Sequence, residues 1–142
     1  MSDCCGNGSK TLIMACAGAA DVGFISDRVA RMLSVAGTGS VYCLAGIGAD
    51  MDGFVKGAKD SRRNVVIDGC PVKCGRKIME KHGIKSESYV VTAFGFKKGD
   101  TGTSEDIVKE AFLKIQKACD SSQLVEEENL PKGGSCGCGG DC

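Results

Sequence analysis

The sequence has no excess of either charge and no long apolar stretch. Its 142 residues include 18 lysines and arginines against 18 aspartates and glutamates, which gives a formal net charge of zero. Proteins that bind nucleic acids or membrane surfaces depend on a positive field, so this balance argues against both kinds of partner. No apolar stretch approaches the roughly 20 residues that a membrane-spanning helix needs. We therefore expect no nucleic-acid partner and no membrane segment.

The sequence also lacks the pattern of a secretory signal. The segment TLIMAC, which ends at Cys16, resembles a lipoprotein signal because small and apolar residues precede a cysteine. Its apolar run is too short, however, and the residues before it lack the positive start of such signals. We therefore expect a cytoplasmic protein. In a reducing compartment, clustered cysteines more often bind metals or take part in catalysis than form disulfides.

Histidine is scarce, whereas cysteine is abundant. The single histidine, His82, precedes Gly83 at the end of a predicted helix. We interpret it as a favourable charge at the helix end and not as a metal ligand. Ten cysteines are a high number for a chain of 142 residues, so their positions need an explanation.

Apolar runs of strand length alternate with helical patterns along the middle of the chain. The predicted strands are residues 10–15, 40–46, 64–69 and 88–95, and the predicted helices are residues 22–36, 51–59, 72–82 and 104–119. Strands of near-continuous apolar character that alternate with helices indicate a parallel sheet covered on both faces. We therefore predict an α/β fold of three layers, with a mainly parallel four-stranded sheet and helices on both faces. Asp21 is a candidate cap for the first helix.

The two ends of the chain differ from this middle part in composition. Residues 1–9 are small and polar, and residues 121–142 combine an acidic stretch with a tail of glycine and cysteine. Neither segment has enough apolar residues to order itself. We therefore predict an α/β metal-binding domain over 10–120, a flexible segment over 1–9, and an acidic linker with a flexible tail over 121–142. The terminal cysteines are either an accessory thiol patch or a tail without a role: Cys4, Cys5, Cys136, Cys138 and Cys142.

Four cysteines of the middle part fall at related positions. Cys16 follows the first predicted strand, Cys43 lies near the end of the second, and Cys70 follows the third. The carboxyl ends of parallel strands point to the crevice in which open α/β folds bind ligands. Cys74 joins the group if a helix begins near Cys70, because positions i and i+4 share one helix face. Four thiolates satisfy the tetrahedral preference of zinc, so we predict a shared metal site.

Each of these cysteines taken alone is more often a small packed apolar residue than a ligand. Their joint placement after successive strands is what favours a shared site. Cys119 is isolated near the end of the last predicted helix, and we interpret it as a core residue.

Three segments resemble the DGC-domain family, which takes its name from an Asp-Gly-Cys motif. They are CAG (residues 16–18), VYCLAGIGA (41–49) and DGCPVKCGRK (68–77), and the resemblance covers about residues 10–98. In that family four cysteines are proposed to bind zinc. The resemblance therefore implies a Zn²⁺ site at Cys16, Cys43, Cys70 and Cys74, and it implies no enzymatic activity.

Asp68, the aspartate of the motif, has two possible roles. It can accept hydrogen bonds from the backbone amides of the Cys70 loop and so support the thiolates from outside the ligand set. It can also cap a helix that begins near Pro71, because aspartate is a good cap and proline favours the first helical position. The sequence does not decide between these roles.

A thiol-based enzyme is the alternative to metal binding. The segment CPVKCGR, Cys70 to Arg76, has the spacing of the phosphate loop in cysteine phosphatases and one class of arsenate reductase. Pro71 removes an amide donor directly after the supposed nucleophile, which weakens this interpretation. A redox or sulfur-transfer role is also open, although three residues separate Cys70 from Cys74 and redox pairs usually have two.

We therefore predict a metal-binding protein with a role in metal sensing or transfer. The sequence leaves open whether the zinc is structural or functional, and it names no substrate and no protein partner.

Overall fold

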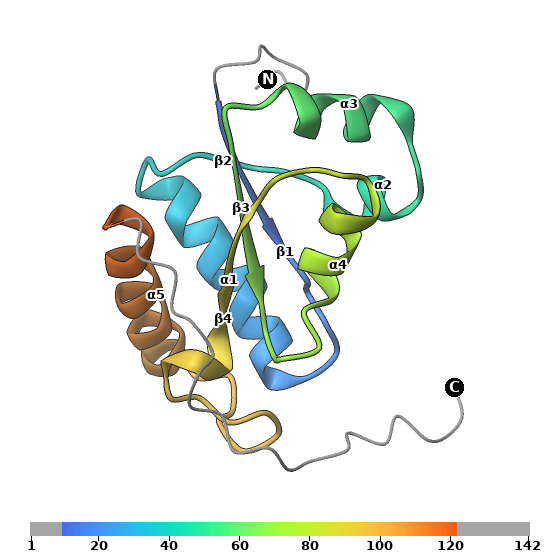
Figure 1. The fold of residues 1–142 in the computed structure, drawn as a ribbon. Coiled ribbons are helices and arrows are strands. Elements are labelled where there is room, and N and C mark those ends of the chain that lie inside the picture. The colour runs from blue at the N-terminus through green and yellow to red at the C-terminus, as the bar shows by residue number, and fades with distance from the viewer. Residues whose placement is uncertain (1–9, 122–142) are drawn as a thin grey trace, which may run out of the picture.

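The structure is a computed structural model that describes residues 10–121. The predicted N-terminal segment 1–9 and nearly all of the predicted segment 121–142 lie outside this range. The described part is built on a parallel sheet with the strand order β2-β1-β3-β4 (Figure 1). The strands are β1 (Thr11–Ala15), β2 (Ser40–Val41), β3 (Arg63–Asp68) and β4 (Glu87–Val90). The predicted four-stranded parallel sheet is confirmed.

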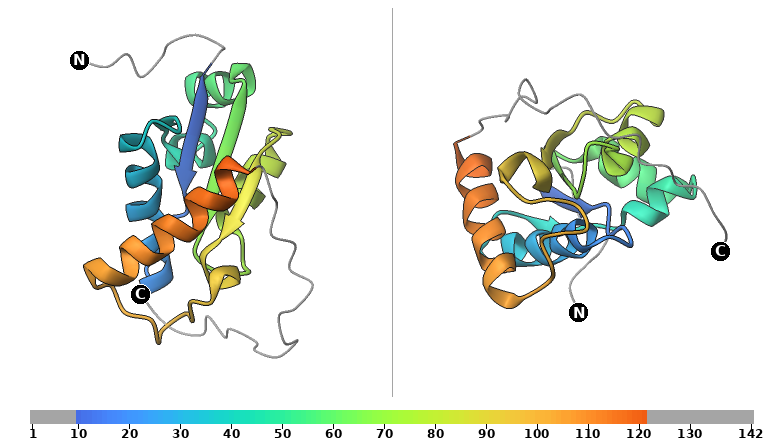
Figure 2. Two further views of the ribbon diagram at one scale, coloured as in Figure 1. Left: turned by 90° about the vertical axis from the view of Figure 1, so that its left-hand side faces the viewer. Right: turned by 90° about the horizontal axis from the view of Figure 1, so that it is seen from below.

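Helices cover both faces of this sheet, as the alternating pattern predicted. They are α1 (Asp21–Val35), α2 (Leu44–Gly48), α3 (Asp52–Asp60), α4 (Cys74–Lys81), the 3-10 helix η1 (Val91–Phe94) and α5 (Glu105–Asp120). Helices α1 and α5 lie on one side of the sheet, and α2, α3 and α4 lie on the other (Figures 1 and 2). The result is the three-layer α/β fold. Within residues 10–121, no helix is long and apolar enough to cross a membrane.

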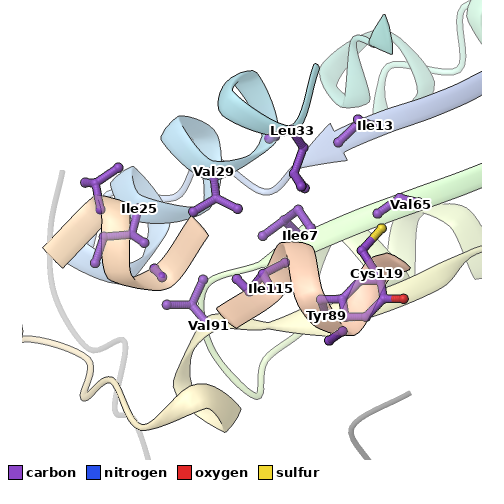
Figure 3. Packing of buried hydrophobic residues seen from close by; sticks show 14 of the residues in the cluster. Ile13, Ile25, Val29, Leu33, Val65, Ile67, Tyr89, Val91, Ile115 and Cys119 are labelled. Atoms are coloured by element: carbon purple, nitrogen blue, oxygen red, sulfur yellow. The ribbon is translucent and has the colours of Figure 1, made fainter. Parts of the chain in front are cut away.

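The core consists of two apolar clusters, one on each face of the sheet. Alternate residues of a strand point to opposite faces, so Val65 and Ile67 of β3 join the cluster under α1 and α5, while Val66 joins the other cluster. Figure 3 shows the first cluster, in which Val29 and Leu33 of α1 face the sheet. Apolar packing therefore holds helices against both faces of the sheet.

The strand order contains a reversal between β1 and β3. The chain passes from β1 to β2 on one side of β1, and then returns to β3 and β4 on the other side. In open α/β sheets, ligands bind outside the carboxyl ends of the strands at such a switch point. The amide of Cys16 donates to the carbonyl of Ile67 at 3.0 Å, which continues the β1–β3 pairing up to this point.

Two predicted strands are shorter than expected. Only Ser40–Val41 of the segment 40–46 form a strand, because Leu44 and Ile47, three residues apart, bury their side chains together and form α2. The segment 88–95 likewise leaves the sheet after Val90 and turns into η1, which ends at Gly95 with φ of 96°. The predicted extension of these two strands is therefore wrong.

The predicted start of one helix and the predicted cap of another are also wrong. The helix predicted over 72–82 begins at Cys74, because Lys73 has a left-handed backbone with φ of 53° that interrupts helical geometry. Cys70 therefore lies in a loop before α4, and the argument that Cys70 and Cys74 share one helix face fails. Asp21 is the first residue of α1, and Ala20 holds the cap position.

Candidate functional site

Three of the four cysteines predicted as ligands follow strand ends, and the fourth begins a helix. We use the term carboxyl rim for residues 16–20, 42–43, 69–74 and 91–92, which follow the strands β1, β2, β3 and β4. Cys16 comes directly after β1, Cys43 two residues after β2 and Cys70 two residues after β3, while Cys74 opens α4. All four carry free thiols. In Figure 1 the strands β1 and β3 run downwards and the chain turns below the sheet after each of them, whereas α2, which follows Cys43, lies higher in the view.

The sulfur of Cys16 lies against the loop that carries Cys70. Cys16 Sγ accepts the amide of Gly69 at 3.3 Å and lies 3.4 Å from the hydroxyl of Ser26 in α1. Gly69 directly precedes Cys70, which is half-buried and packs against the core cluster under α1 and α5. Cys16 and the Cys70 loop therefore meet at the switch point between β1 and β3.

Cys43 and Cys74 begin two helices that pack on each other. Cys43 Sγ accepts the amide of Gly46 at 3.4 Å and so caps α2. The next residue, Leu44, approaches α4 so closely that a Cβ placed on Gly75 would lie 3.2 Å from its Cδ2 atom. The missing side chain at Gly75 therefore lets the two helix starts come together. Cys43 and Cys74 are both exposed.

Asp68 caps α4 from the end of β3. Its carboxylate is only 1% exposed, and it accepts the amide of Gly75 at 2.7 Å and that of Arg76 at 3.1 Å. Burial raises the pKa of Asp68, and the two amides together with the charges of Lys73 and Arg76 oppose that rise. Asp68 directly precedes the loop 69–73, and its carboxylate binds amides that follow the loop. These bonds hold the two ends of the loop together. This capping follows the predicted chemistry, although the helix it caps begins later than predicted.

Two rim residues other than glycine have a left-handed backbone. Ala17, directly after Cys16, has φ of 48°, and Lys73, directly before Cys74, has φ of 53°. Residues with a Cβ rarely adopt this conformation, and it gathers at functional sites where the surroundings enforce it. No sequence pattern indicates this strain, because neither alanine nor lysine is typical of such positions.

The sequence reasoning also missed two hydroxyl groups at the rim. Ser26 is fully buried beside Cys16. Thr92 follows β4, and its amide donates to the carbonyl of Gly69 at 3.3 Å, while its buried hydroxyl has no hydrogen-bond partner in the described part of the chain. A buried hydroxyl without a partner costs about 1–3 kcal/mol.

The rim has donors suited to a thiophilic ion, but their side chains are not drawn together. Among residues 10–121, no three histidine, cysteine, aspartate or glutamate side chains form a group that could hold a metal ion. Cys43 and Cys74 are exposed, so their side chains can change rotamer without disturbing the core. Thiolates are nevertheless the ligands that zinc prefers in four-coordinate sites. His82 lies after the far end of α4, 3.1 Å from Asp50, and takes no part in the rim.

The loop from Cys70 to Arg76 is not arranged as a phosphate cradle. Such a cradle needs free backbone amides that point to the anion. The amides of Gly75 and Arg76 are bound to Asp68, and the amide of Lys73 donates to the carbonyl of Cys70 at 3.0 Å. The Arg76 guanidinium pairs with Glu80 at 2.8 Å. The geometry argues against the phosphatase interpretation.

Comparison with known proteins finds one matching family and one similar protein of known name. The sequence profile described as "DGC domain" matches residues 12–118. The chain is also similar to the anaerobic and virulence modulator AnvM of Pseudomonas aeruginosa, with 26% identity over 109 residues that cover 75% of this chain and 82% of that protein. No solved structure gives a significant match.

Proposed function

Because the chain belongs to the DGC domain family, we propose that its carboxyl rim binds a zinc ion through Cys16, Cys43, Cys70 and Cys74. The observation that carries the proposal is the placement of these four free thiols after β1, β2 and β3 and at the start of α4, with Cys16 and the Cys70 loop at the switch point of the sheet. Thiolate is the ligand that zinc prefers in four-coordinate sites.

The site is better suited to reversible binding than to holding the fold together. Structural zinc sites are usually closed local knuckles, whereas this one joins residues far apart in the sequence at a ligand-binding crevice. Two clusters of apolar side chains already hold the sheet on both faces. The exposure of Cys43 and Cys74 leaves the ion accessible from solvent. We therefore infer a role in metal sensing or transfer.

A regulatory role agrees with the name of the relative. AnvM is named an anaerobic and virulence modulator. Bound zinc would tie the loop 69–73 to the ends of β1 and β2, so loading and unloading would alter this surface. We propose that the chain acts through that change and not as a catalyst.

Replacement of single cysteines tests the ligand set. The background is the full chain with serine at the five terminal cysteines, Cys4, Cys5, Cys136, Cys138 and Cys142, which lie outside the described residues. We expect about one zinc per chain in this background, and at least tenfold weaker binding after replacement of a rim cysteine by serine, because one thiolate ligand is lost. The measurement is metal content together with competition against a chromophoric chelator.

The matched control is Cys119→Ser, which removes a cysteine of the same domain that is only 1% exposed and lies outside the rim. It should leave zinc content unchanged. Full zinc binding in both Cys16→Ser and Cys43→Ser would refute the four-ligand site.

A further inference from the structure

An open groove lies between α1 and α5, the two helices that pack together on one face of the sheet (Figure 2). It has a volume of about 400 Å³, and the residues that line it are Arg28, Arg31, Met32, Val35, Ala36 and Phe112. Four of these six residues are apolar, and Val35 is 91% exposed. The two charged residues of the lining are both arginines, so the groove combines apolar surface with positive charge.

The groove changes in character along α1. Val35 and Ala36 lie at the carboxyl end of this helix and Met32 lies one turn before them, whereas Arg31 and Arg28 lie nearer its middle. The apolar part of the groove is therefore at the end of α1, and the positive part follows in the direction of its start.

The chain leaves α5 at the apolar end of the groove. The carbonyl of Cys119 accepts a hydrogen bond from Arg63, the first residue of β3, so α5 ends at the amino edge of the sheet. Helix α1 ends at the same edge, because a Cβ placed on Gly39 would collide with the carbonyl of Thr11, the first residue of β1. Thr11 and Arg63 are partners in the sheet. The residues that follow Ser121 therefore start at the edge where the apolar part of the groove lies.

The sequence after α5 changes in the same order as the groove. It contains the segment LVEEE, residues 124–128, which lies outside the described residues. Two apolar residues, Leu124 and Val125, come first, and three glutamates follow. So few apolar residues cannot order a segment by themselves, but they can pack on a surface that is already formed. The segment thus runs from apolar to negative, as the groove runs from apolar to positive.

The lengths agree as well as the order. Phe112 lies nine residues before Ser121, which is about 14 Å along α5, and the four residues from Ser121 to Val125 span about 13 Å when extended. Val125 therefore reaches the groove. From Val35 to Arg28, α1 extends about 10 Å, and three extended residues after Val125 span the same distance. The three glutamates thus have the length needed to reach the arginines.

We propose that the segment 124–128 docks in the groove between α1 and α5 of its own chain, with its apolar residues beside Val35 and its glutamates beside Arg28 and Arg31. This inference does not depend on the zinc site. Arg28 pairs with Glu105 and Arg31 with a carboxylate of α1, but each guanidinium has five donors and binds a second carboxylate without releasing the first.

The tether makes a weak contact sufficient. A short connection gives an effective concentration of about 1 mM, so an intrinsic dissociation constant of about 0.1 mM keeps the segment docked about nine-tenths of the time. A second copy of the chain fits the groove less well. A two-fold contact places the same surface of both copies together, so the arginines of one copy would face those of the other.

Hydrogen exchange in the full chain tests the docking. The amides of the segment 124–128 should exchange about tenfold more slowly than those of a free peptide with this sequence, as nine-tenths occupancy requires. The double variant Arg28→Glu and Arg31→Glu should abolish this protection, because the carboxylates then face like charges. Further replacement of the three glutamates by arginine should restore it. Val35→Asp, which changes the exposed apolar part of the groove, should also abolish the protection.

The matched control is the double variant Lys56→Glu and Lys59→Glu, which makes the same change of charge on exposed residues of α3. Helix α3 lies on the other side of the sheet, so the protection should stay as in wild type. Exchange in the wild-type segment as fast as in the free peptide would overturn the inference, and so would protection that survives both the arginine variant and Val35→Asp. Protection that disappears on dilution, with a dimer in sedimentation, would assign the groove to a second copy and contradict docking within the chain.

Discussion

The amino end of strand β3 and its carboxyl end both combine charged side chains with a cysteine, but they satisfy these groups differently. At the amino end, Arg63 donates to the two carboxylate oxygens of Glu87 at 2.7 and 2.6 Å and to the carbonyl of Cys119 at 3.0 Å. The hydroxyl of Tyr89 donates to the same carboxylate at 3.1 Å. Each of these side chains therefore has a partner, and together they tie α5 to β3 and β4.

At the carboxyl rim, which adjoins the other end of β3, several groups are strained or lack a partner. The backbone is left-handed at Ala17 and Lys73, and the buried hydroxyl of Thr92 has no partner within the described residues. The thiols of Cys43 and Cys74 face solvent. By contrast, Cys119 at the amino end is 1% exposed, and burial raises the pKa of its thiol. The same residue type is thus a core residue at one end and an available ligand at the other.

This contrast separates stability from function within one sheet. A polar cluster with every group paired stabilises the contact between elements and leaves nothing to bind a ligand. Strain and unpaired groups persist where the surroundings enforce them, and they gather at binding sites. The carboxyl rim has such strained and unpaired groups, and it includes the point where the strand order reverses.

Removal of the Asp68 carboxylate should have the largest effect. In Asp68→Ala the amides of Gly75 and Arg76 lose their acceptor, and the loop 69–73 is no longer fixed at both ends. We expect a loss of about 3 kcal/mol in the free energy of unfolding, because buried bonds to a charged group are involved. Urea denaturation measures it. Asp68→Asn retains one acceptor oxygen and should lose less, so equal losses in the two variants would contradict the capping role.

A methyl group on Gly69 should have the next largest effect. In Gly69→Ala the new Cβ would meet the backbone of Val22 and Gly23 at 2.8 Å, so α1 and the loop must move apart. We expect a loss of about 2 kcal/mol, typical of overpacking, together with weaker zinc binding.

The control for this change is Gly53→Ala in α3, where an added Cβ meets nothing within 4 Å. It should stabilise the protein by up to about 1 kcal/mol because alanine favours helices. Stability in Gly69→Ala equal to that of wild type would show that the rim is not tightly packed.

The ion pair at the amino end should have the smallest effect, and the effect should depend on pH. The Arg63 guanidinium lowers the pKa of Glu87 below the ordinary glutamate value of 4.5. The folded state therefore binds this proton less readily than the unfolded state. The stabilisation is present above about pH 4.5 and is lost as the pH falls through the lowered value.

The pair is partly exposed, so we expect about 1 kcal/mol or less at neutral pH. Unfolding measured from neutral pH down to about pH 3 in wild type and Glu87→Gln checks this, since the acidic range spans the titration of glutamate. The two curves should converge in acid. A constant difference between them would show that the pair is not the source of the pH dependence.

Much of the fold could be predicted because its central elements follow simple periodicities. The strands β1 and β3 are buried on both faces and read as continuous apolar runs, and α1 and α5 show apolar residues at helical spacing. The exceptions are decided by tertiary contacts. The edge strand β2 pairs with β1 alone, so packing of Leu44 and Ile47 on the sheet determines the conformation of the residues that follow.

The positions of the site residues were easier to predict than their contacts. Strand ends place Cys16 and Cys70 correctly from sequence alone. Asp68 was recognised as a possible cap, but the start of α4 could not be predicted, because it depends on the left-handed backbone of Lys73. The contact of Cys16 with Ser26 joins residues ten positions apart through the fold, and no local pattern indicates it.

X-ray absorption at the zinc edge tests the central claim most directly, because it counts the atoms bound to the ion. The sample is the zinc-loaded full chain with serine at the five terminal cysteines. We expect four sulfur neighbours at about 2.3 Å and no nitrogen or oxygen neighbour. In Cys43→Ser one sulfur should be replaced by an oxygen or lost. A first shell dominated by nitrogen or oxygen, or four sulfurs that persist in Cys43→Ser, would contradict the assignment of the carboxyl rim as the zinc site.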